Sequence, residues 1–408
     1  MFFDLRYLKS QIDLRKFKNK KREAIKLLNK KNYKSNLHDF SFLFQDDLKL
    51  KKKILECNNL FLDYEKIILL GTGGSSLGSK AILEAAYNNK IIFIENIDPH
   101  YVIQKIKQTK KKKILLLIIS KSGETTEVLS LFSILQDNNY RVFKPKNNML
   151  IISDNKNSSL QKISKALSIK FVAHNSKIGG RFSCFSETGL IPIKLAGLNS
   201  AFIKNQSDKV FEECINNKYS FFENVSALSE IIRGKKYKCH VVISYQESLK
   251  SLVLWYRQLW GESLGKKGRG VHYLSAIGSV DQHSQLQMWL DGPDNIFYTI
   301  IIPKKRKQDL KLNYSNKLFP SYLKKKSLGN ILFNMGIATY KALIKAKKPV
   351  RLIYLDDDSL YPAVELMAFF MLEVAVIGKL LRINPFDQPA VEKVKLLTKK
   401  LLSKNGKN

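Results

Sequence analysis

Residues 114–127, ILLLIISKSGETTE, contain the pattern that is most informative about the fold class. The first six residues are all large and apolar, which predicts a β-strand buried on both faces. Small, polar and glycine residues follow from Ser120 and predict a turn, and a helical pattern then extends to about residue 136. A buried strand that leads through a short turn into a helix is typical of a parallel sheet covered by helices.

The same alternation extends along the chain in both directions. In the first half, apolar runs and amphipathic stretches predict strands at Ile67–Leu70, Ile91–Ile94, Ile114–Ile119, Met149–Ile152 and Lys170–Val172, with helices near 76–88, 101–109, 125–136 and 159–167. The second half of the chain shows the same alternation of strands and helices. Strands are predicted at His240–Ser244, Val271–Ser275, Ile296–Ile302 and Val350–Leu355. Helices are predicted at Leu249–Trp260, Leu328–Ala346, Tyr361–Gly378 and near 390–403.

These elements predict an α/β protein with two α/β/α sandwich domains whose sheets are mainly parallel. We expect an N-terminal helical arm at residues 1–45, a first domain at 46–200, a second domain at 201–385 and a C-terminal helix at 386–408. A segment near residues 195–215 is expected to join the two domains.

Composition narrows the class of protein. The chain has 408 residues, of which 44% are hydrophobic, so sizeable cores are expected and extensive disorder is not. Its four cysteines form no CxxC pair, which argues against a disulfide framework or a zinc ribbon. The N-terminal residues carry charges within their apolar stretch, and no apolar run reaches about 18 residues. We therefore expect a cytoplasmic, soluble protein that needs no metal.

Charge is the unusual quantity. Lysine and arginine total 70 against 35 acidic residues, a formal net charge of +35, so anionic partners are expected. Only 11 of the basic residues are arginine, the better ligand for phosphates and base edges, and the lysines are scattered. The pattern therefore favours a lysine-rich solvated surface over a nucleic-acid groove, and we expect neither nucleic acid nor membrane as partner.

Two loops after predicted strands have the composition of a phosphate site. Residues 71–78, GTGGSSLG, follow one strand and open a helix, where free backbone N–H groups and the helix N-terminus favour an anion. Ser76 stands where a dinucleotide fingerprint needs glycine, and no GK[ST] follows, so neither that fingerprint nor a P-loop is matched. The second loop adds three hydroxyls and one cation, which predicts a sugar-phosphate or similar monoester site: Ser120, Lys121, Ser122 and Thr125. A purely structural role in turns and helix caps is the alternative.

Four further segments carry side chains suited to acid–base chemistry. Arg181 follows two glycines and could stabilise a developing oxyanion. Gln258 and Glu262 are four apart, hence on one face of a helix ending near Gly265, and Glu262 is suited to general-base work. The alternative for each of these residues is an exposed side chain without a chemical role.

His283 lies in the polar stretch 278–285, GSVDQHSQ, where Asp281 and Ser284 could orient it for proton transfer. Lys395 lies near a helix start, where a cation is costly unless an anion or a substrate oxygen is close. A structural histidine and a solvated lysine are the alternatives.

Six motifs in order make the chain resemble the glucose-6-phosphate isomerase family: GTGGSSLG, SKSGETTE, GGRFS, ESLGK, GSVDQHSQ and INPFDQPAVEKVK. The resemblance covers about residues 65–400. It implies two sugar-isomerase (SIS-type) domains, usually a homodimer, and the reversible conversion of glucose 6-phosphate and fructose 6-phosphate in glycolysis and gluconeogenesis. It implies no cofactor.

The resemblance also implies roles for single residues. The substrate phosphate would be bound by Ser75, Ser120, Ser122 and Thr125, beside Gly74, Lys121 and Gln258. Glu262 would move the proton between C2 and C1, and Arg181 would stabilise the cis-enediol(ate) intermediate. His283, donated by the partner subunit, and Lys395 would serve ring opening, while Gln388 would help to hold the substrate.

One departure from the family pattern is Glu124, a negative charge inside the phosphate loop that we expect to point outward. Two other functions stay open at this stage. One is a dual phosphoglucose/phosphomannose isomerase, because the choice of epimer depends on the pocket near C2. The other is a non-catalytic SIS-type sugar-phosphate sensor, which would have no reason to keep Glu262, Arg181, His283 and Lys395 together.

Overall fold

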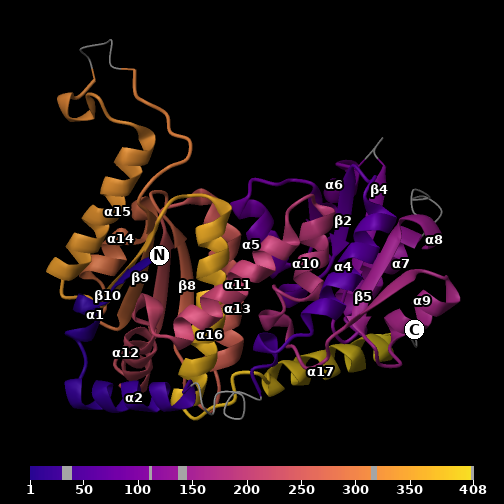
Figure 1. The fold of residues 1–408 in the computed structure, drawn as a ribbon, viewed down its shortest axis with the longest axis horizontal. Helices are drawn as coiled ribbons and strands as arrows, with labels where there is room; N and C mark the ends of the chain where they lie inside the picture. The colour runs from indigo at the N-terminus through magenta and orange to yellow at the C-terminus, as the bar shows by residue number, and fades with distance from the viewer. Residues whose placement is uncertain (30–38, 110–112, 137–144, 314–318, 406–408) are drawn as a thin grey trace.

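The structure is a computed structural model and describes residues 1–29, 39–109, 113–136, 145–313 and 319–405. Within these residues there are two five-stranded sheets. Figure 1 shows the sheets side by side, with helices α5, α10, α11, α13 and α16 between them. The mixed α/β class with mainly parallel sheets, expected from the sequence, is confirmed.

The first sheet has the strand order β3-β2-β4-β5-β6, and all its neighbouring strands are parallel. Its strands are β2 (Lys66–Leu70), β3 (Ile91–Ile94), β4 (Ile114–Ile119), β5 (Met149–Asp154) and β6 (Lys170–His174). The helices of this half are α4 (Asp47–Phe61), α5 (Leu77–Ala85), α6 (Pro99–Lys107), α7 (Thr126–Gln136), α8 (Pro145–Asn148), α9 (Ser159–Ala166) and α10 (Glu187–Leu195).

The second sheet has the order β1-β10-β9-β7-β8. Its parallel strands are β7 (Cys239–Ser244), β8 (His272–Ile277), β9 (Ile296–Pro303) and β10 (Val350–Leu355). The helices of this half are α11 (Ser200–Ile215), α12 (Phe221–Arg233), α13 (Lys250–Leu264), α14 (Gln282–Asp291), α15 (Leu328–Lys345), α16 (Leu360–Leu380) and α17 (Pro389–Asn405).

The N-terminal arm differs from the sequence expectation. It begins with a strand, β1 (Phe2–Asp4), which pairs antiparallel with β10 at the edge of the second sheet. Helices α1 (Arg6–Lys9) and α2 (Leu14–Leu27) follow, and α2 packs on α12 and α16. A three-residue strand has too few residues to show a period, which is why the helical pattern of its neighbours concealed it. Residues 30–38 of the expected arm lie outside the described residues.

The inner parallel strands are buried on both faces because their alternate side chains enter different cores, whereas the edge strand β8 exposes His272 and Leu274 on one face. In β2, Ile67 and Leu69 face a central core that extends to the second sheet, while Ile68 and Leu70 face α6, α7 and α9. In β7, Val242 faces the central core. The uninterrupted apolar runs therefore reflect burial of the strands on both faces of the sheet, as inferred from the sequence.

Helix α16 occupies the centre of the shared core. Among the described residues it is the one helix long and apolar enough to cross a membrane, yet 83% of its most apolar 18-residue window is buried inside the protein. Its Glu373 is fully buried and pairs with Arg351 of β10 at 2.5 Å, with further hydrogen bonds from Asn224 and Tyr256. These contacts satisfy a charge in the middle of an apolar helix. Helix α11, in the expected joining segment, packs directly on α16.

Candidate functional site

The two predicted phosphate loops lie at one edge of the first sheet. The loop after β2 and the loop after β4 start from neighbouring parallel strands, so both lie at the carboxyl edge. Ligands bind at this edge in open parallel sheets because the loops and helix N-termini converge there. The residues predicted on these loops are therefore brought to the same part of the molecule.

The second loop forms a compact cradle of hydroxyls and backbone N–H groups. The hydroxyls of Ser120 and Thr125 are 2.7 Å apart, and Ser120 Oγ also accepts a hydrogen bond from the N–H of Gly123. Gly123 has a φ of +67°, and a Cβ there would lie 2.2 Å from Ser158 Oγ, so no other residue fits this turn. Ser122 is exposed, and its Oγ accepts from the N–H of Glu124.

Glu124 turns away from the cradle, as expected. Its carboxylate accepts hydrogen bonds from the N–H and hydroxyl of Ser159, at the start of α9. The backbone bond from Ser159 is the chief reason that the pKa of Glu124 is lowered. A negative charge in this loop is thereby bound to a helix N-terminus.

The first loop lies against the glycine loop that carries Arg181. A Cβ on Gly74 would lie 2.2 Å from the carbonyl carbon of Gly180, so the two backbones approach as only glycine allows. Ser183 Oγ also donates to the carbonyl oxygen of Gly74 at 3.3 Å. Ser75 is partly exposed at the end of this loop. This packing brings the loop of Gly74 and Ser75, which is expected to bind phosphate, next to Arg181, which is expected to stabilise an oxyanion.

Arg181 is the centre of the hydrogen-bond network, and only 2% of its surface is exposed. Its guanidinium donates to five acceptors: Ser263 Oγ at 2.8 Å, Glu262 Oε2 at 3.2 Å, Gln388 Oε1 at 2.6 Å, and the carbonyl oxygens of Pro385 at 2.6 Å and Asp387 at 2.9 Å. Burial lowers the pKa of Arg181, and the neighbouring Glu262 carboxylate opposes that change. The rigid fork of an arginine suits this many fixed acceptors.

Helix α13 presents Gln258 and Glu262 on one face, as the four-residue spacing predicts. Gln258 Nε2 donates to Glu262 Oε1 at 3.0 Å, so the two carboxylate oxygens of Glu262 have different partners. The Glu262 side chain remains 31% exposed. Gln258 Oε1 is buried and has no hydrogen-bond partner among the described residues.

Sequence reasoning did not single out Lys266 and Asp387. Lys266 Nζ lies 2.9 Å from Asp387 Oδ1 and also donates to the carbonyl oxygen of Asn384. The bond from Lys266 lowers the pKa of Asp387. This pair holds the segment that supplies Gln388 to Arg181. Both residues lie inside quoted motifs, ESLGK and FDQ, so their positions carried a signal whose meaning only the contact shows.

Lys121 is half-buried, and burial lowers its pKa. The negative charge of Asp154 opposes this change, and the positive charge of Arg181 adds to it. The cation of the phosphate loop is thus within electrostatic reach of Arg181.

His283 does not join this cluster within the chain. It is exposed in the first turn of α14 and makes no side-chain hydrogen bond among the described residues. The expectation that Asp281 and Ser284 orient it is wrong: Asp281 accepts from the N–H of Ile277 at 2.7 Å and from Ser284 Oγ at 3.1 Å. Asp281 has these nearer donors because α14 begins right after it.

Lys395 is also exposed, on α17, where its Nζ lies 2.8 Å from Glu392. The charge of Lys399, one turn further on, contributes to the lowered pKa of Glu124. Figure 1 shows α17 passing beneath the first half of the molecule, with the C-terminus near α9. The helix therefore follows the side of the protein on which the phosphate loop lies.

Comparison with known proteins identifies the class of fold. The chain aligns with a glucose-6-phosphate isomerase from Chlamydia trachomatis with a TM-score of 0.78 at 20% identity, covering 89% of this chain and 76% of that one. It aligns with a tagatose-6-phosphate ketose/aldose isomerase from Escherichia coli with a TM-score of 0.53 at 13% identity, over 92% and 94% of the two chains. The fold is that of the SIS-type phosphosugar isomerases.

Sequence similarity then identifies the family. The phosphoglucose isomerase family profile matches residues 59–408. Glucose-6-phosphate isomerase from Campylobacter jejuni is 32% identical over 83% of this chain and 86% of its own length, and that from Thermus thermophilus is 31% identical over 83% and 84%. The chain belongs to the phosphoglucose isomerase family and is an isomerase, as the six motifs predicted. A sugar phosphate as substrate is consistent with this family.

Proposed function

We propose that the chain interconverts glucose 6-phosphate and fructose 6-phosphate by proton transfer through a cis-enediol intermediate, with Glu262 as the base. The observation that carries this proposal is the position of the Glu262 carboxylate, which is partly exposed while it is held by Arg181 and Gln258. A base must reach the substrate and yet be fixed in direction, and this arrangement meets both needs.

In the proposed reaction, Glu262 takes the proton from C2 of the open-chain aldose and returns it to C1. Negative charge develops on O1 as the C2 proton leaves, and the proton of the C2 hydroxyl passes to O1 before C1 is protonated, so that the carbonyl of the ketose forms at C2. The buried guanidinium of Arg181 is suited to stabilise that charge because it is permanently charged and preorganised by its five acceptors. The same steps in reverse convert the ketose to the aldose.

The phosphate of the substrate is proposed to bind Ser120, Ser122 and Thr125, together with Gly74 and Ser75, beside Lys121. Hydroxyls, backbone N–H groups and one cation converge at this edge of the sheet. Contacts to a phosphate remote from C1 and C2 position the reacting carbons. Gln258 and Gln388 are proposed to hold sugar hydroxyls.

Ring opening is assigned in the proposal to Lys395 and to His283 of a second copy of the chain. Lys395 follows Gln388 by seven residues, about two turns or ~10 Å of helix. Exposed apolar side chains flank His283, with Val280 68% and Met288 57% exposed, as an interface between two copies would require. We therefore propose a homodimer. We also propose, as a separate point, that the protein is located in the cytoplasm.

The test is a coupled assay of fructose 6-phosphate conversion by the purified full chain, run in deuterated water. Conversion with deuterium incorporation at the reacting carbon is expected, because a carboxylate base exchanges its proton with solvent. Absence of conversion would overturn the proposal. A parallel assay with mannose 6-phosphate distinguishes a phosphoglucose isomerase from one with dual specificity.

A further inference from the structure

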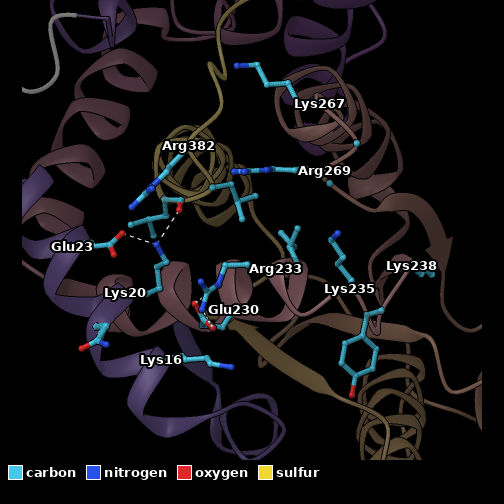
Figure 2. A pocket seen from close by; sticks show the side chains of 17 residues that line it. Lys16, Lys20, Glu23, Glu230, Arg233, Lys235, Lys238, Lys267, Arg269 and Arg382 are labelled. Carbon is cyan, nitrogen blue, oxygen red and sulfur yellow. Dashed lines mark hydrogen bonds and ion pairs between the residues drawn. The ribbon is translucent and has the colours of Figure 1, made fainter.

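A cavity of about 850 Å³ lies outside the candidate site. Its walls come from α2, the end of α12, the loop after α13 and the end of α16 (Figure 2). Arg181, Gln258, Glu262 and Gln388 do not line it. Cavities of this volume commonly bind small organic molecules, so the chemistry of the lining indicates what this one could hold.

The lining is strongly cationic. Eight of its 17 residues are lysine or arginine and two are glutamate. Both glutamates already have cationic partners: Lys20 Nζ lies 2.6 Å from Glu23, and Arg233 Nε lies 3.1 Å from Glu230. Each glutamate is therefore paired, and the lining keeps a formal excess of six positive charges, eight cations less two carboxylates.

Five of the cations have no carboxylate partner within the described residues: Lys235, Lys238, Lys267, Arg269 and Arg382. All five are exposed side chains. Figure 2 shows Arg269 and Arg382 on one side of the cavity and Lys235 and Lys238 on another. Like charges gathered around one hollow repel each other, and an anion between them removes that repulsion.

Helix ends explain only part of this charge. Helices α12, α13 and α16 end near the cavity, and a cation beside each carboxyl end is favourable. Arg233 already occupies the last turn of α12. The effect acts only within a helix's last turn, so it does not account for both Lys235 and Lys238 beyond that end.

One wall is held rigidly. The Lys20 side chain is 8% exposed, and its Nζ donates to the carbonyl oxygen of Leu380 at 3.1 Å as well as to Glu23. This bond joins α2 to the end of α16, next to Arg382. The backbone from which Arg382 extends is thereby held in place, and a fixed backbone lowers the cost of ordering that side chain around an anion.

We propose that this cavity binds a small molecule that carries two or more phosphate groups. Arginine forks bind phosphate oxygens in pairs, and the lysines act as point charges around them. A single phosphate would neutralise at most two of the five unpaired cations. The proposal does not depend on the reaction catalysed at the candidate site.

The experiment is calorimetric titration of the full chain with inorganic tripolyphosphate, in the presence of saturating fructose 6-phosphate so that the phosphate loop is occupied. One equivalent is expected to bind. Arg269→Gln/Arg382→Gln should weaken binding by about tenfold or more, because charge-assisted hydrogen bonds are lost. Lys235→Gln/Lys238→Gln should do so independently.

The matched control is Lys324→Gln/Lys325→Gln, which removes the same charge from two exposed residues outside the cavity. The affinity of this control variant for tripolyphosphate should stay within about twofold of that of the parent chain. Equal weakening by the control and the cavity variants, or no binding to the parent chain, would overturn the proposal. Tighter binding of a single-stranded oligonucleotide, weakened by the cavity variants, would also overturn it in favour of nucleic acid. Circular dichroism of each variant checks that it is folded.

Discussion

Arg181 and Glu262 are 81 positions apart in the chain, yet Arg181 Nη1 lies 3.2 Å from Glu262 Oε2. The arginine is buried, whereas 31% of the glutamate side chain is exposed. The pair thus combines a fixed cation with a carboxylate that a substrate can reach. Such a pair suits an isomerase, in which a proton is moved while charge develops on a neighbouring oxygen.

Replacement of the proposed base is expected to stop the reaction and spare binding. Glu262→Gln should lower kcat by about 10²- to 10⁴-fold, because an amide cannot accept the C2 proton. Its oxygen can still accept from Arg181, so calorimetry should show fructose 6-phosphate bound with similar affinity. Glu56→Gln, an exposed glutamate on α4, is the control and should keep full turnover. Near-normal turnover in Glu262→Gln would remove it from the role of base.

Replacement of Arg181 by lysine keeps the positive charge but removes most of the hydrogen bonds that the guanidinium donates, so it tests those hydrogen bonds. A lysine cannot serve Ser263, Gln388 and two carbonyl oxygens at once, so buried acceptors lose their donors. The free energy of unfolding, from urea denaturation, should fall by ~2–4 kcal/mol. Turnover should fall by about 10²- to 10³-fold. Arg257→Lys on the same helix as Glu262 is exposed and should change neither quantity. Full activity in Arg181→Lys would contradict the proposed role.

Complementation tests whether His283 acts across a dimer interface. His283→Ala and Glu262→Gln should each be nearly inactive. Co-expressed, they should recover about a quarter of normal activity, since half of the dimers are mixed and each mixed dimer has one intact site. The measurement is the coupled assay on the whole co-expressed pool, purified through a tag that both chains carry. Co-expression of Arg181→Lys with Glu262→Gln is the control and should recover nothing, because both residues belong to one chain's site. No recovery with His283→Ala would argue against donation by the partner.

The acid stability of the protein should depend on Glu187. Burial would raise the pKa of this carboxyl, but hydrogen bonds from His174 and Lys53 outweigh it and lower the pKa to about 2. A lowered pKa in the folded state stabilises the protein above the unfolded pKa, and this stabilisation is lost as the pH falls toward 2.

The free energies of unfolding of the parent chain and of Glu187→Gln, from urea denaturation, should therefore differ most above about pH 5, and the difference should shrink progressively as the pH falls from about 4.5 to about 2. The change in the difference is on the order of 3 kcal/mol. Glu56→Gln should run parallel to the parent chain. A constant difference between Glu187→Gln and the parent chain across this range would show that the carboxylate does not contribute in this way.

The strands, and the positions of the two loops proposed to bind phosphate, were predictable from local sequence. Ile114–Ile119 is a strand with the predicted bounds, because six consecutive apolar residues can be buried only on both faces of a sheet. The turn at Gly123 and the bond between Ser120 and Thr125 follow within a few residues of that strand. Strand β1 was not predictable, because its three residues gain their partner from β10, at the far end of the chain.

The site was predictable only as separate motifs. Local patterns in the sequence were enough to show which side chains have suitable chemistry and that two of the loops follow parallel strands, because both depend on residues close together in the chain. The contacts of Arg181 with Glu262 and Gln388, the pairing of Lys266 with Asp387 and the position of His283 apart from its own chain's cluster became known from the folded structure. Those relationships depend on how helices pack in a core shared by both sheets, and contacts between distant segments are set by the burial of that core rather than by local preference.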